Sequence, residues 1–141
     1  MLRLGRPIPL ASARHAAGFT ALLPPRASGA YIGHDVPGGR VSIVLGRLLI
    51  TEFRGASRPI VFKTIDPGTT VEMTRVDGVQ AVYLSGAPHQ VLYAAANGQI
   101  RADRVRLAGN VLIWQRDGVI VRIEGTHTLA EALAIARSLR R

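Results

Sequence analysis

The strongest constraint on the fold of this chain is an Asp117-Gly118 pair between two runs of apolar residues near its end. Both central residues of a two-residue hairpin turn adopt positive φ, which aspartate tolerates and glycine favours, so the pair predicts a tight β-hairpin. Its expected strands are residues 111–115 and 119–123. Asn97-Gly98 predicts a second hairpin turn on the same grounds.

A capped helix is expected directly after this hairpin. Thr128 and Glu131 form a T-x-x-E capping box, in which the threonine hydroxyl accepts from the third helical N–H and the glutamate accepts from the N–H of the cap residue. Apolar residues then recur at helical spacing, so we expect one face to pack on a sheet. That face consists of Leu129, Ala132, Leu133, Ala136 and Leu139, and the arginines at 137, 140 and 141 suit the negative end of the helix dipole.

The remaining pattern is one of short strands joined by turns. Strands are expected at residues 19–23, 29–35, 40–45, 47–54, 69–76, 80–84 and 89–95, and a short helix at 10–17 that begins after Pro9 and ends at Gly18. No helix of crossover length separates the strands, which favours antiparallel pairing. The fold class is therefore α+β: a single domain over residues 1–141, with a curved antiparallel meander of roughly seven to nine strands and the N-terminal and C-terminal helices packed on one face.

Several of these strands are apolar on both sides. In residues 111–114, Val111 and Ile113 point one way while Leu112 and Trp114 point the other. One sheet face can take the helices, so something must cover the other. Strand curvature and loops are the favoured cover, and the alternative is a concave apolar groove for a ligand or partner.

Composition limits the function classes. The net charge is +9, carried almost wholly by arginine, with Lys63 as the one lysine. A basic chain can attract nucleic acid or an anionic membrane surface, but these arginines are spread along the chain, which does not favour a nucleic-acid interface. The absence of cysteine excludes disulfides and thiolate chemistry. No segment approaches the ~18 apolar residues of a membrane span.

The residues of a catalytic or metal site do not assemble in this sequence. The four histidines lack metal-ligand spacing, and Ser85, four residues before His89, lacks a nucleophile-elbow motif. Glu52, Glu72 and Glu124 lie in strand patterns beside arginines, where ion pairing is the ordinary expectation. We therefore predict a protein that is not an enzyme and that needs no metal or cofactor.

The candidate residues for binding a ligand or partner come from the second half of the chain. They are Arg106, Asn110, Trp114, Tyr83 and His89. Arg106 can bind an acidic group, although tying its own turn to a carboxylate or carbonyl is the favoured interpretation. Gly109-Asn110 can adopt positive φ and redirect the chain into the Trp114 strand.

The region that carries the hairpin and helix resembles a known family. Leu112 to Trp114, Gly118, Arg122 to Glu124 and the helix from Leu129 to Leu139 are similar to the C-terminal signature of an uncharacterised domain family in bacterial, actinobacterial-type, membrane-anchored proteins that are anti-sigma-factor-like. Upstream similarity includes residues 4–19, Thr51 to Gly55 and residues 85–89, so it extends over most of the chain. Val82-Tyr83 stands where the family pattern has a Tyr-Trp pair.

The resemblance implies a function and a location. It implies a non-enzymatic extracytoplasmic sensor or interaction domain, attached to the cell membrane through a segment that is absent from these residues; a cytoplasmic location is the alternative. The partner would be a protein or an apolar ligand. Two other functions stay open: a carrier-like module that holds a lipid or other apolar ligand on the concave sheet face, and a basic nucleic-acid-binding protein.

Overall fold

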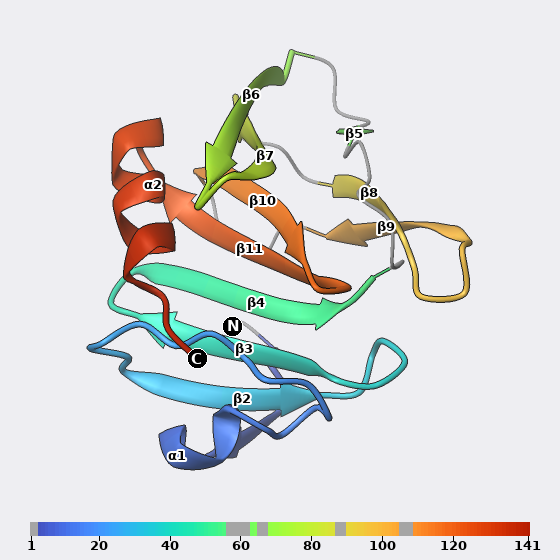
Figure 1. Ribbon diagram of the computed structural model, residues 1–141, viewed down its shortest axis with the longest axis vertical. Coiled ribbons are helices and arrows are strands. Elements are labelled where there is room, and N and C mark those ends of the chain that lie inside the picture. The colour runs from blue at the N-terminus through green and yellow to red at the C-terminus, as the bar shows by residue number, and fades with distance from the viewer. Residues whose placement is uncertain (1–2, 56–62, 65–67, 87–89, 105–108) are drawn as a thin grey trace.

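The computed structural model describes residues 3–55, 63–64, 68–86, 90–104 and 109–141, which form two sheets and two helices (Figure 1). In chain order the elements are β1 (Arg6–Ile8), α1 (Leu10–Ala13), β2 (Gly29–Gly33), β3 (Arg40–Leu45), β4 (Leu48–Arg54), β5 (Lys63–Thr64), β6 (Thr70–Val76), β7 (Val79–Ser85), β8 (Gln90–Ala94), β9 (Ile100–Arg104), β10 (Asn110–Arg116), β11 (Val119–Thr126) and α2 (Leu129–Ser138). The fold is α+β and mostly β.

The large sheet is antiparallel, and it is a meander only in its first half. Its eight strands lie in the order β1-β2-β3-β4-β11-β10-β7-β6, and β5, β8 and β9 form a separate three-stranded sheet. The expected single meander is therefore wrong beyond β4, because the last hairpin returns to pair with β4. β11 is buried along almost its whole length, which suits a central position, whereas β6 exposes Val71 and Met73 at the sheet edge.

The predicted Asp-Gly hairpin is confirmed. Asp117 and Gly118 adopt φ of 53° and 76°, and they join β10 to β11. A second Asp-Gly pair at Asp77 and Gly78 has nearly the same angles, 47° and 82°, and joins β6 to β7. Positive φ at both central residues twists the turn in the sense that the flanking strands need. Gly98, with φ of 84°, lies in the turn between β8 and β9, as predicted.

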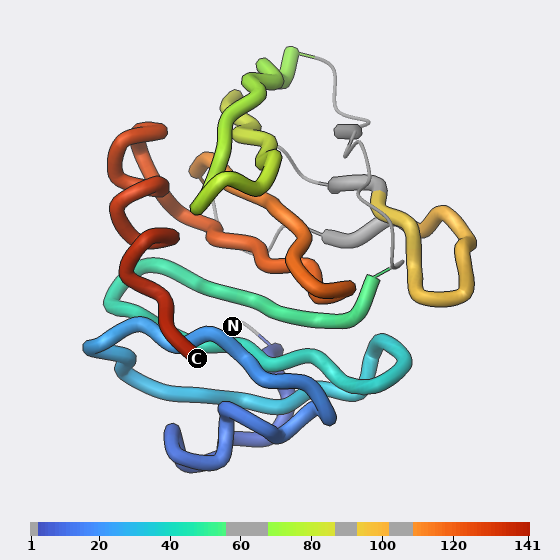
Figure 2. The backbone as a smooth tube through the Cα atoms, viewed as in Figure 1, coloured from blue at the N-terminus to red at the C-terminus, as the bar shows by residue number. Residues whose placement is uncertain are grey.

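The N-terminal region differs from its sequence-based expectation. The helix expected over residues 10–17 ends at Ala13, because residues 14–18 continue as tight turns in which Ala16 N–H donates to Ala13 and Gly18 N–H donates to His15. Residues 19–23 do not form a strand. Leu23 instead exchanges two backbone hydrogen bonds with Arg140, N–O distances 2.7 and 2.9 Å, so the N-terminal and C-terminal segments lie side by side (Figure 2).

The C-terminal helix forms as predicted, with one change at its cap. Glu131 N–H donates to the Thr128 hydroxyl at 3.1 Å, but the returning bond joins the Glu131 carboxylate to His127 N–H rather than to that of Thr128. The two nitrogens are neighbours, so a slight shift of the carboxylate selects the earlier one. Ala132 and Ala136 are buried against the sheet, and their small side chains allow α2 to pack closely.

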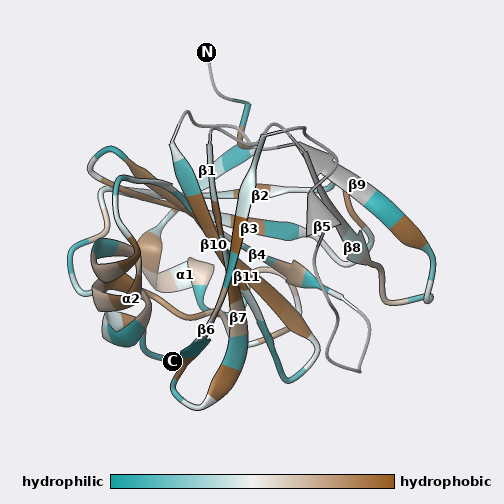
Figure 3. Cartoon of the chain, turned by 90° about the horizontal axis from the view of Figure 1, so that it is seen from above, coloured by the Kyte–Doolittle hydropathy of each residue, from teal (hydrophilic) through white to brown (hydrophobic). Residues whose placement is uncertain are grey.

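Both faces of the large sheet are packed. One face forms a core to which Ala13 of α1 and Ala136 of α2 contribute, so both helices share a face. The opposite face forms a second core that includes Phe53, Val111 and Ile113, together with Tyr93 of β8. Apolar residues accordingly run along the central strands (Figure 3). The Phe53 and Tyr93 rings meet edge to face at 5.1 Å, which places the small sheet over this second face.

Candidate functional site

The three predicted binding residues that the structure describes do not gather into a pocket. Trp114 and Tyr83 are buried in the helix-side core, with exposed fractions of 1% and 5%. Asn110 is half-buried at the start of β10, where its amide donates to the Tyr83 hydroxyl at 2.9 Å and to the His127 carbonyl at 3.1 Å. His89 and Arg106 lie outside the described residues. In this arrangement Asn110 joins β7 and the α2 entry, which is a structural role.

The turn before β10 matches its expectation in part. Gly109 adopts φ of 116°, and an added Cβ would lie 3.1 Å from Gly125 Cα, so glycine suits both the angle and the close approach. Asn110 does not adopt positive φ. It begins β10, where the pairing with β11 shifts by a bulge between Asn110 and Val111. The chain therefore changes direction into β10 at Gly109 and at the bulge between Asn110 and Val111.

The three glutamates that we expected to form ion pairs have different surroundings. Glu124 is buried and pairs with Arg122 at 2.8 Å, as expected. Glu72 is exposed on β6. The expectation is wrong for Glu52, which is fully buried and has no guanidinium partner among the described residues. Arg122 points to the opposite face of the sheet, and Arg54, on the same face as Glu52, contacts the Phe19 ring and the Gly18 carbonyl instead.

Glu52 lies in the middle of the large sheet. Its register partners are Val41 on β3 and Val121 on β11, both in the helix-side core. Leu22 N–H donates to Glu52 Oε1 at 2.7 Å, so the segment after α1 crosses directly above the carboxyl. The other oxygen, Oε2, is buried and has no hydrogen-bond partner in the described part of the chain.

This environment favours the protonated carboxyl. Burial raises the pKa of Glu52 from 4.5 to about 8, and the hydrogen bond from Leu22 N–H opposes the rise without cancelling it. A buried carboxylate without a cationic partner is costly, whereas the neutral acid is tolerated. Glu52 is therefore uncharged at neutral pH, and because Oε1 accepts from Leu22 N–H, the proton is assigned to the buried Oε2.

A pocket opens above this carboxyl. Its volume is about 150 Å³. The lining residues come from four separate parts of the chain: Phe19, Thr20 and Leu22 after α1, Glu52 on β4, Arg116, Asp117, Val119 and Val121 around the β10–β11 turn, and Arg141 at the C-terminal side. The Glu52 side chain itself is covered, with an exposed fraction of 0%, so it forms the floor beneath a wall that combines apolar and polar side chains.

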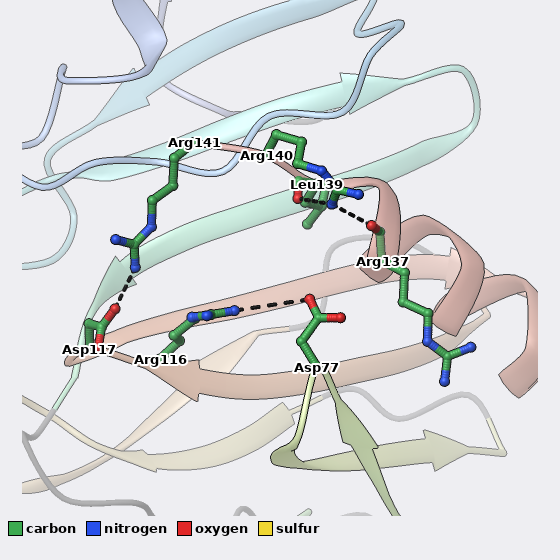
Figure 4. Close-up of polar contacts among 7 residues, drawn as sticks. All are labelled: Asp77, Arg116, Asp117, Arg137, Leu139, Arg140 and Arg141. Atoms are coloured by element: carbon green, nitrogen blue, oxygen red, sulfur yellow. Dashed lines mark hydrogen bonds and ion pairs between the residues drawn. The ribbon is translucent and has the colours of Figure 1, made fainter.

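Charged residues from two β-turns and the C-terminal segment meet at the pocket mouth (Figure 4). The Arg141 guanidinium forms an ion pair with the Asp117 carboxylate, and Arg116 lies 4.0 Å from Asp77. The arginine side chains are 42% and 56% exposed for Arg116 and Arg141. Two guanidiniums and one carboxylate therefore line a mouth that is open to solvent.

Arg54 lies next to the Phe19 side of the pocket. The Arg54 guanidinium lies 5.6 Å from the centre of the Phe19 ring and donates to the Gly18 carbonyl at 2.8 Å. This contact holds the Phe19 side of the pocket against β4. The pocket thus has apolar side chains inside and charged side chains of both signs at its mouth.

A signal for Glu52 was present in the sequence. Ile50 and Glu52 are two residues apart in a strand, so they share a face, and Ile50 belongs to the core. An acidic residue in phase with a core position indicates the face on which the carboxyl lies. The rim residues had no such signal, because Asp117 and Arg141 are brought together by tertiary structure.

Other classes of site have no support in the described residues. No group of three histidine, aspartate or glutamate side chains there is arranged to hold a metal ion. None of the helices described is long and apolar enough to cross a membrane. Comparison with protein-family models, curated proteins and solved structures finds no match to this chain.

Proposed function

We propose that this chain is a non-enzymatic, ligand-binding sensor domain of a membrane-tethered, anti-sigma-factor-like regulator, on the outer side of the cell membrane. The single observation that carries ligand binding is the Glu52 pocket, where a buried carboxyl with an unpartnered Oε2 underlies apolar walls and a basic rim. The regulatory context rests on the sequence resemblance. Convergent polar groups within an apolar pocket are the usual form of a small-molecule site.

Binding accounts for this site better than catalysis does. General acid–base chemistry needs a carboxyl within hydrogen-bond reach of a reacting group. Glu52 has no accessible surface, and the other carboxylate of the pocket, Asp117, is engaged by Arg141. A fixed, covered acid sets the polarity of the pocket floor without meeting a reacting atom.

A ligand in this pocket would contact two separate parts of the fold. Phe19 and Leu22 lie shortly after the N-terminal helix, whereas Val119 and Asp117 belong to the central hairpin. A ligand that contacts both would stabilise the arrangement in which the N-terminal segment lies on the sheet. Because a ligand shifts a conformational equilibrium by its differential affinity, this contact supplies a physical route for a signal.

The size of the pocket favours sensing over lipid carriage. About 150 Å³ is the volume of a cavity that accepts a benzene-sized molecule. Both sheet faces are filled by core residues in the described part of the chain. We therefore prefer a small ligand to the alternative of a lipid held on a concave face.

A fragment screen by two-dimensional NMR tests the proposal. We expect pocket-lining amides, including Thr20 and Val121, to shift with several fragments. Thr20→Trp should block these shifts because it adds a large side chain at the exposed pocket edge, while Thr70→Trp on the β6 edge should leave them intact. A screen in which no fragment perturbs the pocket, or in which Thr20→Trp changes nothing, would contradict ligand binding here.

A further inference from the structure

We propose that the Glu52 pocket takes a small amphipathic carboxylate, with its apolar body against Leu22 and Val121 and its anionic head between Arg116 and Arg141. This inference rests on the proposed ligand-binding function and adds the chemical class of the ligand. The three features that carry it are the apolar wall, the charge of the rim and the uncharged floor.

The wall sets the size and polarity of the ligand body. Phe19, Leu22, Val119 and Val121 give the pocket its apolar lining, and its volume of about 150 Å³ corresponds to one six-membered aromatic ring. A ring with one charged substituent fits such a space with the substituent at the mouth. Benzoate is the simplest molecule with this design.

The rim sets the sign of the head group. Among the lining residues Arg116 and Arg141 carry two positive charges against one negative charge on Asp117, and Asp77 lies just outside the lining, 4.0 Å from Arg116, so the lining itself is net cationic. The Arg141–Asp117 ion pair shows that a carboxylate already sits within reach of this guanidinium (Figure 4). A ligand carboxylate would take the place of Asp117, and Arg116, which is 4.0 Å from Asp77, can turn toward it.

The floor admits an anion as long as Glu52 holds its proton. The groups that face this carboxyl are the Leu22 N–H, the valines of β3 and β11, and, across the pocket, Arg116, Asp117 and Arg141. Anion affinity should therefore fall as Glu52 ionises, and this fall should disappear in Glu52→Gln.

Three ligands of one shape but different charge test the proposal: benzoate, neutral benzamide and cationic benzamidinium. Affinities are measured by calorimetry and NMR titration with the full chain at pH 6.5. We expect benzoate to bind at least tenfold tighter than the other two. Arg116→Gln and Arg141→Gln should each lower the affinity for benzoate about 3–10-fold, as expected for partly exposed charge-assisted contacts. Arg101→Gln on β9 should change this affinity by less than about twofold.

Asp117→Asn is expected to raise the affinity for benzoate, whereas the arginine variants lower it. It removes the internal competitor for Arg141 and retains a residue that tolerates the positive φ of this turn. Benzoate affinity should rise several-fold, whereas the matched loss of an exposed carboxylate in Glu72→Gln should leave it unchanged. In the wild type affinity should drop as pH rises from 6.5 to 9, and in Glu52→Gln it should stay constant.

The outcomes separate this inference from the function on which it rests. If benzamide or benzamidinium binds in the pocket as tightly as benzoate, ligand binding stands and the carboxylate class is wrong. If none of the three binds while other fragments still occupy the pocket, the carboxylate class is again wrong. If benzoate binds but the arginine variants and Arg101→Gln weaken it equally, the binding reflects general charge, and the proposed rim contacts are overturned.

Discussion

Replacing Glu52 by glutamine changes one protonation equilibrium and little else, and its effect can be worked out in advance. Below pH 4.5 the carboxyl is protonated in the folded and the unfolded chain alike. As pH rises toward 8, the unfolded chain loses the proton while burial keeps it on folded Glu52, whose pKa is raised to about 8. The unfolded state then binds fewer protons, so the free energy of unfolding falls with rising pH.

The magnitude follows from the same linkage. Each pH unit within this window corresponds to ~1.4 kcal/mol, so Glu52 lowers the free energy of unfolding by about 3 kcal/mol at pH 7 and by about 5 kcal/mol once both states are ionised, given the rise from 4.5 to about 8. Glutamine keeps an oxygen for Leu22 N–H and has no proton to lose. The variant should therefore lack this pH dependence.

Urea denaturation of both proteins at pH 5, 6, 7 and 8 measures the effect. We expect the stability of Glu52→Gln relative to the wild type to rise by about 3–4 kcal/mol across this range. Contributions from the groups that the two proteins share cancel in the difference. Glu72→Gln, on the exposed β6 strand, should show no such trend. A difference for Glu52→Gln that stays constant to within about 0.5 kcal/mol would refute the assignment of a proton-bearing carboxyl.

Three further stability predictions concern the sheet and the helix, and each can be checked by the same denaturation assay. Gly55→Ala should cost about 1–3 kcal/mol, because the added Cβ would lie 2.6 Å from Ile120 Cδ1 in the second core; a neutral result would mean that this core repacks freely. Arg122→Met should cost about 3–5 kcal/mol, since it strips Glu124 of a buried partner at 2.8 Å; an unchanged stability would show that the ion pair is dispensable. Thr128→Ala should lower the free energy of unfolding by about 1 kcal/mol, because it removes the side chain that caps α2. The helical circular dichroism signal should then be lost at a lower temperature than in the wild type. Full retention of stability would argue against the cap.

The elements that could be predicted from sequence are those whose signals are local. The Asp117-Gly118 turn and the Thr128 cap each specify their geometry within a few residues, and both form. Alternation along residues 111–114 assigned Val111 and Trp114 to opposite faces, and the two cores follow this assignment.

Strand order could not be predicted, because it depends on contacts between distant segments. The choice of β4 as a partner for β11 joins residues about seventy positions apart, such as Glu52 and Val121. The same holds for residues 19–23, whose alternation indicates a strand but whose partner is Arg140 near the end of the chain. An extended segment with one bridge cannot be distinguished from a strand by its pattern.

The candidate site was missed for a related reason. Sequence proximity suggested an ion pair between Glu52 and Arg54, which share a face of the strand, but the Arg54 guanidinium contacts the Gly18 carbonyl and the Phe19 ring, two partners that sequence does not reveal. Alternation within 48–54 puts Glu52 in phase with Ile50, which indicates the face but not the burial, since Arg54 is in the same phase and exposed. The meeting of Arg116 and Arg141 at one rim is a property of the fold, since twenty-five positions separate them in the sequence.

The most direct test of a ligand pocket above Glu52 is an isotope-filtered NOE experiment on the labelled protein with unlabelled benzoate at pH 6.5. We expect contacts from the ring protons to the methyl groups of Leu22, Val119 and Val121, and none to the exposed Ile100 on β9. Contacts confined to Ile100 or other exposed side chains, or no contacts at millimolar benzoate, would contradict this expectation.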